Sequence, residues 1–92
     1  MTRKEQFMEL MKMTAIKGMT VFYFGVKMKD FPQEELIVNH VDNLDKKLEY
    51  IDKTYNDDMK HASGMVEITS FGHSLDMTTM PDDVIYEFDE EN

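Results

Sequence analysis

The 92-residue chain predicts an α+β fold of two layers, in which two helices cover one face of a small antiparallel sheet of three to four strands. Three observations lead to this class. Residues 20–26 are rich in β-branched and aromatic side chains, residues 42–60 carry apolar side chains at helical spacing, and turn-forming residues separate such segments. The predicted order is α-β-β-α-β-(β). We place a single domain at residues 1–88 and expect residues 89–92 to be a flexible acidic tail.

The first helix is predicted from Thr2 to about Lys17. Thr2 and Glu5 have the spacing of a capping box, in which each side chain satisfies the backbone N–H of the other residue. A narrow apolar stripe follows, and Gly18 suits the end of a helix because glycine readily adopts the left-handed conformation. The narrow stripe leaves a frayed arm as the alternative.

Two strands are predicted next. Residues 20–26 are apolar on both faces, which is typical of a strand that is central in its sheet or covered on both sides. Residues 27–33 contain Asp30 and Pro32 and form a connection. The second strand then covers Glu34 to His40, and an antiparallel pair is the simplest topology.

The second helix is predicted from Asp42 to about Lys60, with Asp42 or Asn43 as its N-cap. Its apolar residues lie within about 80° of arc when each residue turns the helix by 100°. They are Leu44, Leu48, Ile51, Tyr55 and Met59. Residues 62–64 are predicted to end this helix.

The last third of the chain is predicted to hold a strand, a loop and a short final element. The third strand covers Met65 to Phe71 and the loop covers Gly72 to Asp82. Residues 83–88 alternate in polarity, which predicts either a short fourth strand or one helical turn.

The charge is distributed unevenly along the chain. The net charge is −9, from 19 acidic and 10 basic residues. Residues 1–60 hold all ten basic and eleven acidic residues, so their net charge is −1. Residues 61–92 hold eight acidic and no basic residues, so theirs is −8. A field of this sign repels nucleic acid and attracts basic surfaces, so direct binding of nucleic acid is not expected.

Two interpretations of the acidic segment remain open. It is either a solvated tail that keeps the protein dispersed, or a surface that docks on a basic groove as a DNA mimic, with carboxylates in place of phosphates. Apolar residues among the acids, such as Ile85 and Phe88, have no use in a solvating tail, although they suit a last core strand. The candidate partner-binding residues are Asp82, Asp83, Tyr86, Glu87, Asp89, Glu90 and Glu91.

Catalytic and metal-binding motifs are missing from the sequence. With no Cys there is no thiol nucleophile and no Cys-ligated metal. The spacing His73-x-x-Asp76 often occurs by chance and does not indicate a metal site. Ser70 and Ser74 flank His73 but belong to no nucleophile motif. We therefore expect no enzyme activity, no catalytic residues, no metal and no cofactor. The ten Met residues either fill the core or line a pliable binding surface.

The segment Asn39-His40-Val41-Asp42-Asn43-Leu44, continued through residue 59, resembles small acidic proteins encoded by bacteriophages. The resemblance carries no catalytic or binding residue with it. It implies expression inside a bacterial host cell, in the cytoplasm, and binding to a host or phage protein. Phage inhibitors of host defence, anti-CRISPR proteins among them, are similar in size and acidity. The longest stretch without a charged residue is 18–26, too short to span a bilayer, and no signal peptide or membrane contact is expected.

The sequence thus predicts a non-catalytic interaction protein that presents its acidic surface to a basic, nucleic-acid-handling host protein. The alternative is a small homo-oligomeric structural or regulatory protein, such as a homodimer, with an idle acidic tail. Its contact would be the stripe of the second helix or an edge of the sheet.

Overall fold

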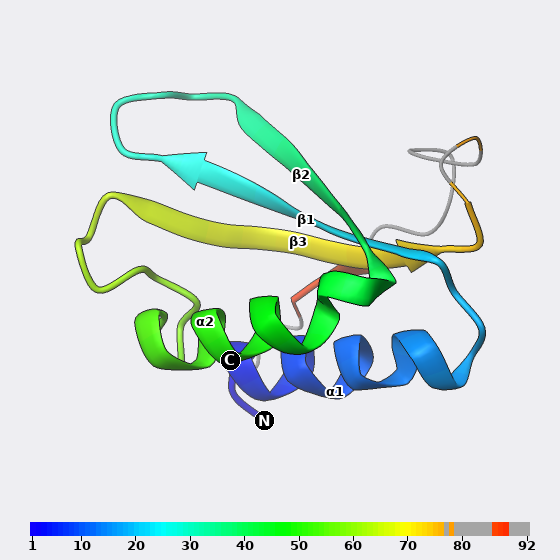
Figure 1. The fold of residues 1–92 in the computed structure, drawn as a ribbon. Helices are drawn as coiled ribbons and strands as arrows, with labels where there is room; N and C mark the ends of the chain where they lie inside the picture. Colours follow the sequence, from blue (N-terminus) through cyan, green and yellow to red (C-terminus); the bar gives the residue numbers. More distant parts are fainter. Residues whose placement is uncertain (77, 79–85, 89–92) are drawn as a thin grey trace.

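The computed structural model describes residues 1–76, 78 and 86–88 (Figure 1). The elements along the chain are α1 (Arg3–Ile16), β1 (Val21–Met28), β2 (Glu34–His40), the 3-10 helix η1 (Val41–Asn43), α2 (Leu44–Thr54), β3 (Val66–Ser74) and β4 (Tyr86–Glu87). The α+β class and the order α-β-β-α-β-β are therefore confirmed. The predicted tail at residues 89–92 lies outside the described residues.

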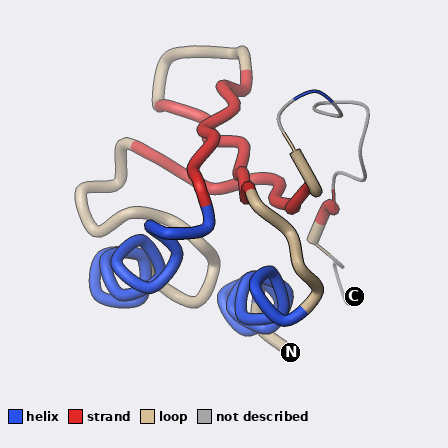
Figure 2. The backbone as a smooth tube through the Cα atoms, turned by 45° about the vertical axis from the view of Figure 1, so that its right-hand side comes forward, coloured by secondary structure: helices blue, strands red, loops and turns tan. Residues whose placement is uncertain are grey.

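The four strands form one antiparallel sheet in the order β2-β1-β3-β4. β1 lies inside the sheet, as its two apolar faces predicted, and its first six residues are buried. Both helices lie on the same side of the sheet (Figures 1 and 2). The two-layer arrangement is therefore confirmed, and the opposite face of the sheet carries no helix among the described residues.

α1 begins with the predicted capping box. The backbone N–H of Glu5 donates to Thr2 Oγ1 at 3.1 Å, and the backbone N–H of Thr2 donates to Glu5 Oε1 at 2.8 Å. The hydrogen bond that the backbone N–H of Thr2 donates to the Glu5 carboxyl is the main cause that lowers the pKa of this carboxyl below its ordinary value. Gly18 follows the helix with a φ of 75°, as expected for a helix end. α1 is therefore a capped helix and not a frayed arm.

α2 is shorter than predicted, because it ends at Thr54 and not near Lys60. The chain turns at Asn56, whose side-chain oxygen accepts hydrogen bonds from the backbone N–H groups of Asp58 and Lys60, both at 3.0 Å. Such local bonds compete with helix formation. Met59, at a positive φ of 62°, is nevertheless completely buried. Helical spacing thus identified a core residue correctly but assigned it to the wrong element.

The N-cap of α2 is Asn43, one of the two residues predicted for it, but the hydrogen bonding there differs from the prediction. Asn43 makes no side-chain capping hydrogen bond. The capping side chain is His40, whose Nδ1 accepts from the backbone N–H of Asp42 at the start of η1. Residues 62–64 form part of a turn that leads into β3 instead of ending a helix.

β3 is longer than predicted. Gly72 and its two successors were predicted in a loop, but β3 continues to Ser74. Gly72 pairs with Tyr23 of β1, and a Cβ atom at Gly72 would lie 2.6 Å from that buried ring. The glycine therefore accommodates a neighbouring ring within a strand. Tyr86 and Glu87 form a strand and not a helical turn, whereas residues 83–85 of that predicted element lie outside the described residues.

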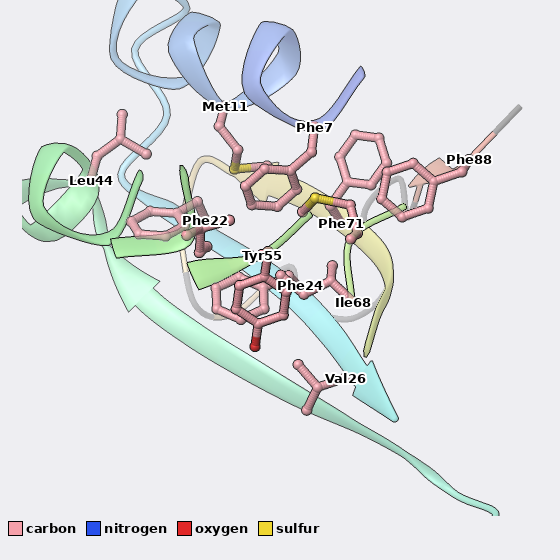
Figure 3. Packing of buried hydrophobic residues seen from close by; sticks show 12 residues of the cluster. Phe7, Met11, Phe22, Phe24, Val26, Leu44, Tyr55, Ile68, Phe71 and Phe88 are labelled. Carbon is pink, nitrogen blue, oxygen red and sulfur yellow. The ribbon is translucent and has the colours of Figure 1, made fainter. Parts of the chain in front are cut away.

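The core lies between the helices and the sheet (Figure 3). Phe7 of α1 packs edge-on against Phe24 and Phe71, with ring centroids 6.1 and 5.7 Å apart. Phe88 extends this group of rings, 4.8 Å from Phe71. α1 and the two central strands, β1 and β3, thus share one aromatic cluster. Phe88, which follows β4, joins this cluster.

Candidate functional site

The structure describes two of the seven predicted partner-binding residues, Tyr86 and Glu87. Both lie in β4, the edge strand that pairs with β3. The other five, Asp82, Asp83, Asp89, Glu90 and Glu91, lie outside the described residues. The site is therefore built from β4 and from what surrounds it.

β4 is held against the body of the protein by pairing and by ring contacts. Glu87 pairs with Ser70, and Tyr86 pairs with Phe71. The rings of Tyr86 and Phe71 stack, with centroids 5.9 Å apart and planes inclined by 25°. Phe88, the next residue, is buried at 8% exposure. At residues 86–88 the acidic third of the chain is therefore packed on the core and does not dangle.

A hollow of about 350 Å³ lies between α1 and β4. Its apolar lining comes from Leu10 and Met13 of α1 and from Phe71 and Tyr86. Two exposed carboxylates, Glu9 and Glu87, also border it. An apolar floor with acidic groups at its rim suits the long side chains of Arg and Lys, which have an apolar stem and a cationic head. Sequence reasoning missed Glu9 and Met13, since only the fold brings α1 beside β4.

The charges around β4 are less uniform than the sequence indicates. Arg3 Nη1 lies 3.5 Å from Glu67 Oε2, and the Arg3 guanidinium lies 5.3 Å from the centre of the Phe88 ring. Arg3 and Lys27 line a second hollow, which Glu67 and Glu87 also border. Part of the −8 of residues 61–92 is therefore balanced by Arg3, which pairs with Glu67. Glu87 borders both hollows, whereas Glu9 borders only the hollow between α1 and β4.

A second carboxylate arrangement, on the face of the sheet opposite the helices, was not predicted. Glu34 of β2 reaches across Gly25 of β1 to β3, where it accepts a hydrogen bond from Ser70 Oγ at 3.0 Å and another from Thr69 Oγ1. A side chain at Gly25 would collide with Glu34 and Ser70. This arrangement ties three strands together. A glycine inside a strand was its only sequence signal.

All three His residues make contacts within the fold. His73 is buried and its Nδ1 lies 3.1 Å from Thr14 Oγ1. His61 contacts Ser63 and packs edge-on against Tyr55, and His40 caps η1. Within residues 1–76, 78 and 86–88, no group of three or more His, Asp or Glu side chains is placed to hold a metal ion.

Comparisons with protein-family models, with curated proteins and with solved structures found no match to this chain. No helix in the described part of the chain has the length and apolar character needed to cross a membrane.

Proposed function

We propose that this chain is a non-catalytic binding protein that presents the acidic surface around β4 to a basic surface of another protein. The observation that carries the proposal is that two acidic residues, Glu9 and Glu87, line the same hollow as the apolar residues Leu10, Met13 and Tyr86. We define this β4 surface as Glu9, Leu10, Met13, Tyr86 and Glu87, together with the acidic residues predicted on either side of β4.

The β4 surface suits a partner that offers Arg or Lys side chains. The stem of such a side chain would lie on Leu10 and Met13, where the flexible Met adapts to its shape. Its cationic head would meet Glu9 and Glu87, and an Arg guanidinium would also stack on Tyr86, which is 36% exposed. Tyr and Arg are among the residue types that contribute most to binding energy at protein interfaces.

Nucleic-acid-handling proteins are the class of partner that this chemistry favours. Their phosphate-binding grooves carry clustered Arg and Lys side chains, and an acidic surface docked there would compete with the nucleic acid. The resemblance of residues 39–59 to phage proteins favours a bacterial host protein as the partner and inhibition as the outcome. An inhibitor of the DNA-mimic type, such as an anti-CRISPR protein, is the form of this proposal that we favour.

The test is affinity capture from a bacterial lysate at low and high salt, followed by titration of the captured protein in purified form. Neutralising four acids should weaken binding at least tenfold and flatten its salt dependence, since fewer counterions are released. The four substitutions are Asp82→Asn, Asp83→Asn, Glu87→Gln and Asp89→Asn.

A control variant changes the net charge equally at exposed positions away from β4. Its substitutions are Asp30→Asn, Asp45→Asn, Asp57→Asn and Asp58→Asn. The proposal requires this control to bind nearly as well as the unchanged protein. Equal affinity of both variants, or a captured partner that salt fails to release, contradicts it.

A further inference from the structure

β2 is one of the two edge strands of the sheet, and the other is the two-residue β4. Among the described residues β2 pairs only with β1, and none of its residues belongs to the buried core. Leu36 is 41% exposed and Ile37 is 36% exposed. β2 contains no Lys and no Pro, two residue types by which edge strands avoid pairing with another chain, and its charged residues are confined to Glu34 and Glu35 at one end. We infer that β2 pairs antiparallel with β2 of a second copy of this chain.

The hydrogen bonds of β1 and β2 determine which backbone groups of β2 point outward. The backbone N–H of Val41 donates to the carbonyl of Thr20 at 2.8 Å, just before the first paired residues of these strands. Hydrogen-bonded and non-bonded pairs alternate in an antiparallel ladder. Glu35, Ile37 and Asn39 therefore direct their backbone groups toward β1. The backbone groups of Glu34, Leu36, Val38 and His40 face away from the sheet.

In an antiparallel pair, residues whose backbone groups face the partner strand lie opposite one another. In a symmetric pair of β2 strands, even-numbered residues must therefore lie opposite even-numbered residues, which limits the possible registers. The register centred on Ile37 pairs all seven residues of both strands. It places Leu36 opposite the partner's Val38, and Ile37 opposite the partner's Ile37 on the two-fold axis. A shift centred on Leu36 would place Glu35 opposite the partner's Ile37. A shift centred on Val38 would place Ile37 opposite the partner's Asn39.

Charge favours the register centred on Ile37 over the register centred on Leu36. The register centred on Ile37 places the acidic end of β2, Glu34 and Glu35, beside the end of the partner's strand that carries Asn39 and His40. Acidic side chains of the two copies are thus kept apart. The side-chain nitrogen of Asn39 is buried without a hydrogen-bond partner in the described part of the chain. In this register the partner's Glu35, a hydrogen-bond acceptor, lies opposite Asn39 on the same face of the sheet.

The first test is the mass of the protein across a concentration series. A pair of seven-residue strands buries less surface than the ~1,200–2,000 Å² of stable interfaces, so the association depends on concentration. Sedimentation equilibrium should show a rise from 10.9 kDa toward twice that mass. Ile37→Lys, which brings two cations together on the axis, should weaken the association at least tenfold. Ile16→Lys, at an exposed Ile of α1, should leave it unchanged. A constant monomer mass overturns the inference.

The second test measures the register. The chain has no Cys, so a single introduced thiol can form a disulfide only between copies. Ile37→Cys lies opposite itself and should give a covalent dimer under mild oxidation. Leu36→Cys faces its counterpart only diagonally, about 7–8 Å away, and should react far more slowly. Equal rates for these two variants, or a rate for Ile37→Cys no higher than that of Ile16→Cys, contradict this register. Neither test involves the β4 surface, so its result is separate from that of the proposed function.

Discussion

Gly25 and Gly72 each leave room in the sheet for a side chain from a neighbouring strand. The neighbour of Gly72 is the ring of Tyr23, which is completely buried and has no room to move. The neighbours of Gly25 are the ends of the Glu34 and Ser70 side chains, which can rotate away. Replacing glycine by alanine should therefore lower the free energy of unfolding by different amounts at the two positions.

We predict that Gly72→Ala lowers the free energy of unfolding by about 2–3 kcal/mol, whereas Gly25→Ala lowers it by about 1 kcal/mol. Urea denaturation followed by circular dichroism measures both values. In a Glu34→Ala background, Gly25→Ala should cost less, because the main obstacle is gone. A larger cost for Gly25→Ala than for Gly72→Ala would show that the packing described for Tyr23 is wrong.

Gly72 also shows why residue-level prediction failed in places. Next to His73 and Ser74, a glycine resembles the start of a loop, and the sequence predicted one. The reason for glycine there is the ring of Tyr23, which is distant in the sequence and adjacent only after folding. Thr2 and Glu5, by contrast, interact across one helical turn, and their capping box was predicted correctly.

At the level of elements, the capping box determines how firmly α1 begins. Thr2→Ala removes the acceptor for the backbone N–H of Glu5 and should lower the free energy of unfolding by about 1 kcal/mol. Thr2→Ser retains a hydroxyl and should restore most of that loss. Thermal unfolding at neutral pH measures both. Equal stability of Thr2→Ala and the unchanged protein would contradict the role of the cap.

The same cap predicts a dependence on pH. The hydrogen bonds from Thr2 hold the pKa of Glu5 below its ordinary value of 4.5 in the folded protein. The unfolded chain therefore binds this proton more readily, and acid favours unfolding. The contribution of Glu5 is complete above pH 4.5 and is lost as the pH falls through the lower, folded pKa. Glu5→Gln should remove this part of the acid sensitivity, which melting curves between pH 7 and 2 would show. An unchanged acid profile for Glu5→Gln contradicts this assignment.

The order of the elements was predictable, but the end of α2 was not. Apolar spacing of 3.6 residues continued to Met59, and that residue is indeed buried. The helix ends earlier because Asn56 binds the backbone of the following residues. Spacing reports which residues face the core, and it does not distinguish a helix from a turn that brings the same residue to the same place.

At the level of the whole molecule, charge counted along the chain differs from charge arranged in space. The last third of the sequence has no basic residue, yet Arg3 lies against Glu67 and Phe88 in the fold. Conversely, Glu9 of α1 joins Glu87 beside the hollow. The sequence predicted Tyr86 and Glu87 of β4 as part of the candidate site. It could not identify the contribution of α1, because that depends on how the two layers pack.

The most direct test of the β4 surface is an NMR titration of the ¹⁵N-labelled protein with a hexa-arginine peptide, with hexa-lysine for comparison. We predict saturable shifts of the backbone signals of Glu9, Met13, Tyr86 and Glu87, which should be stronger with arginine because its planar head stacks on Tyr86. Shifts spread evenly over exposed acids far from β4, such as Asp45 and Asp57, would contradict it.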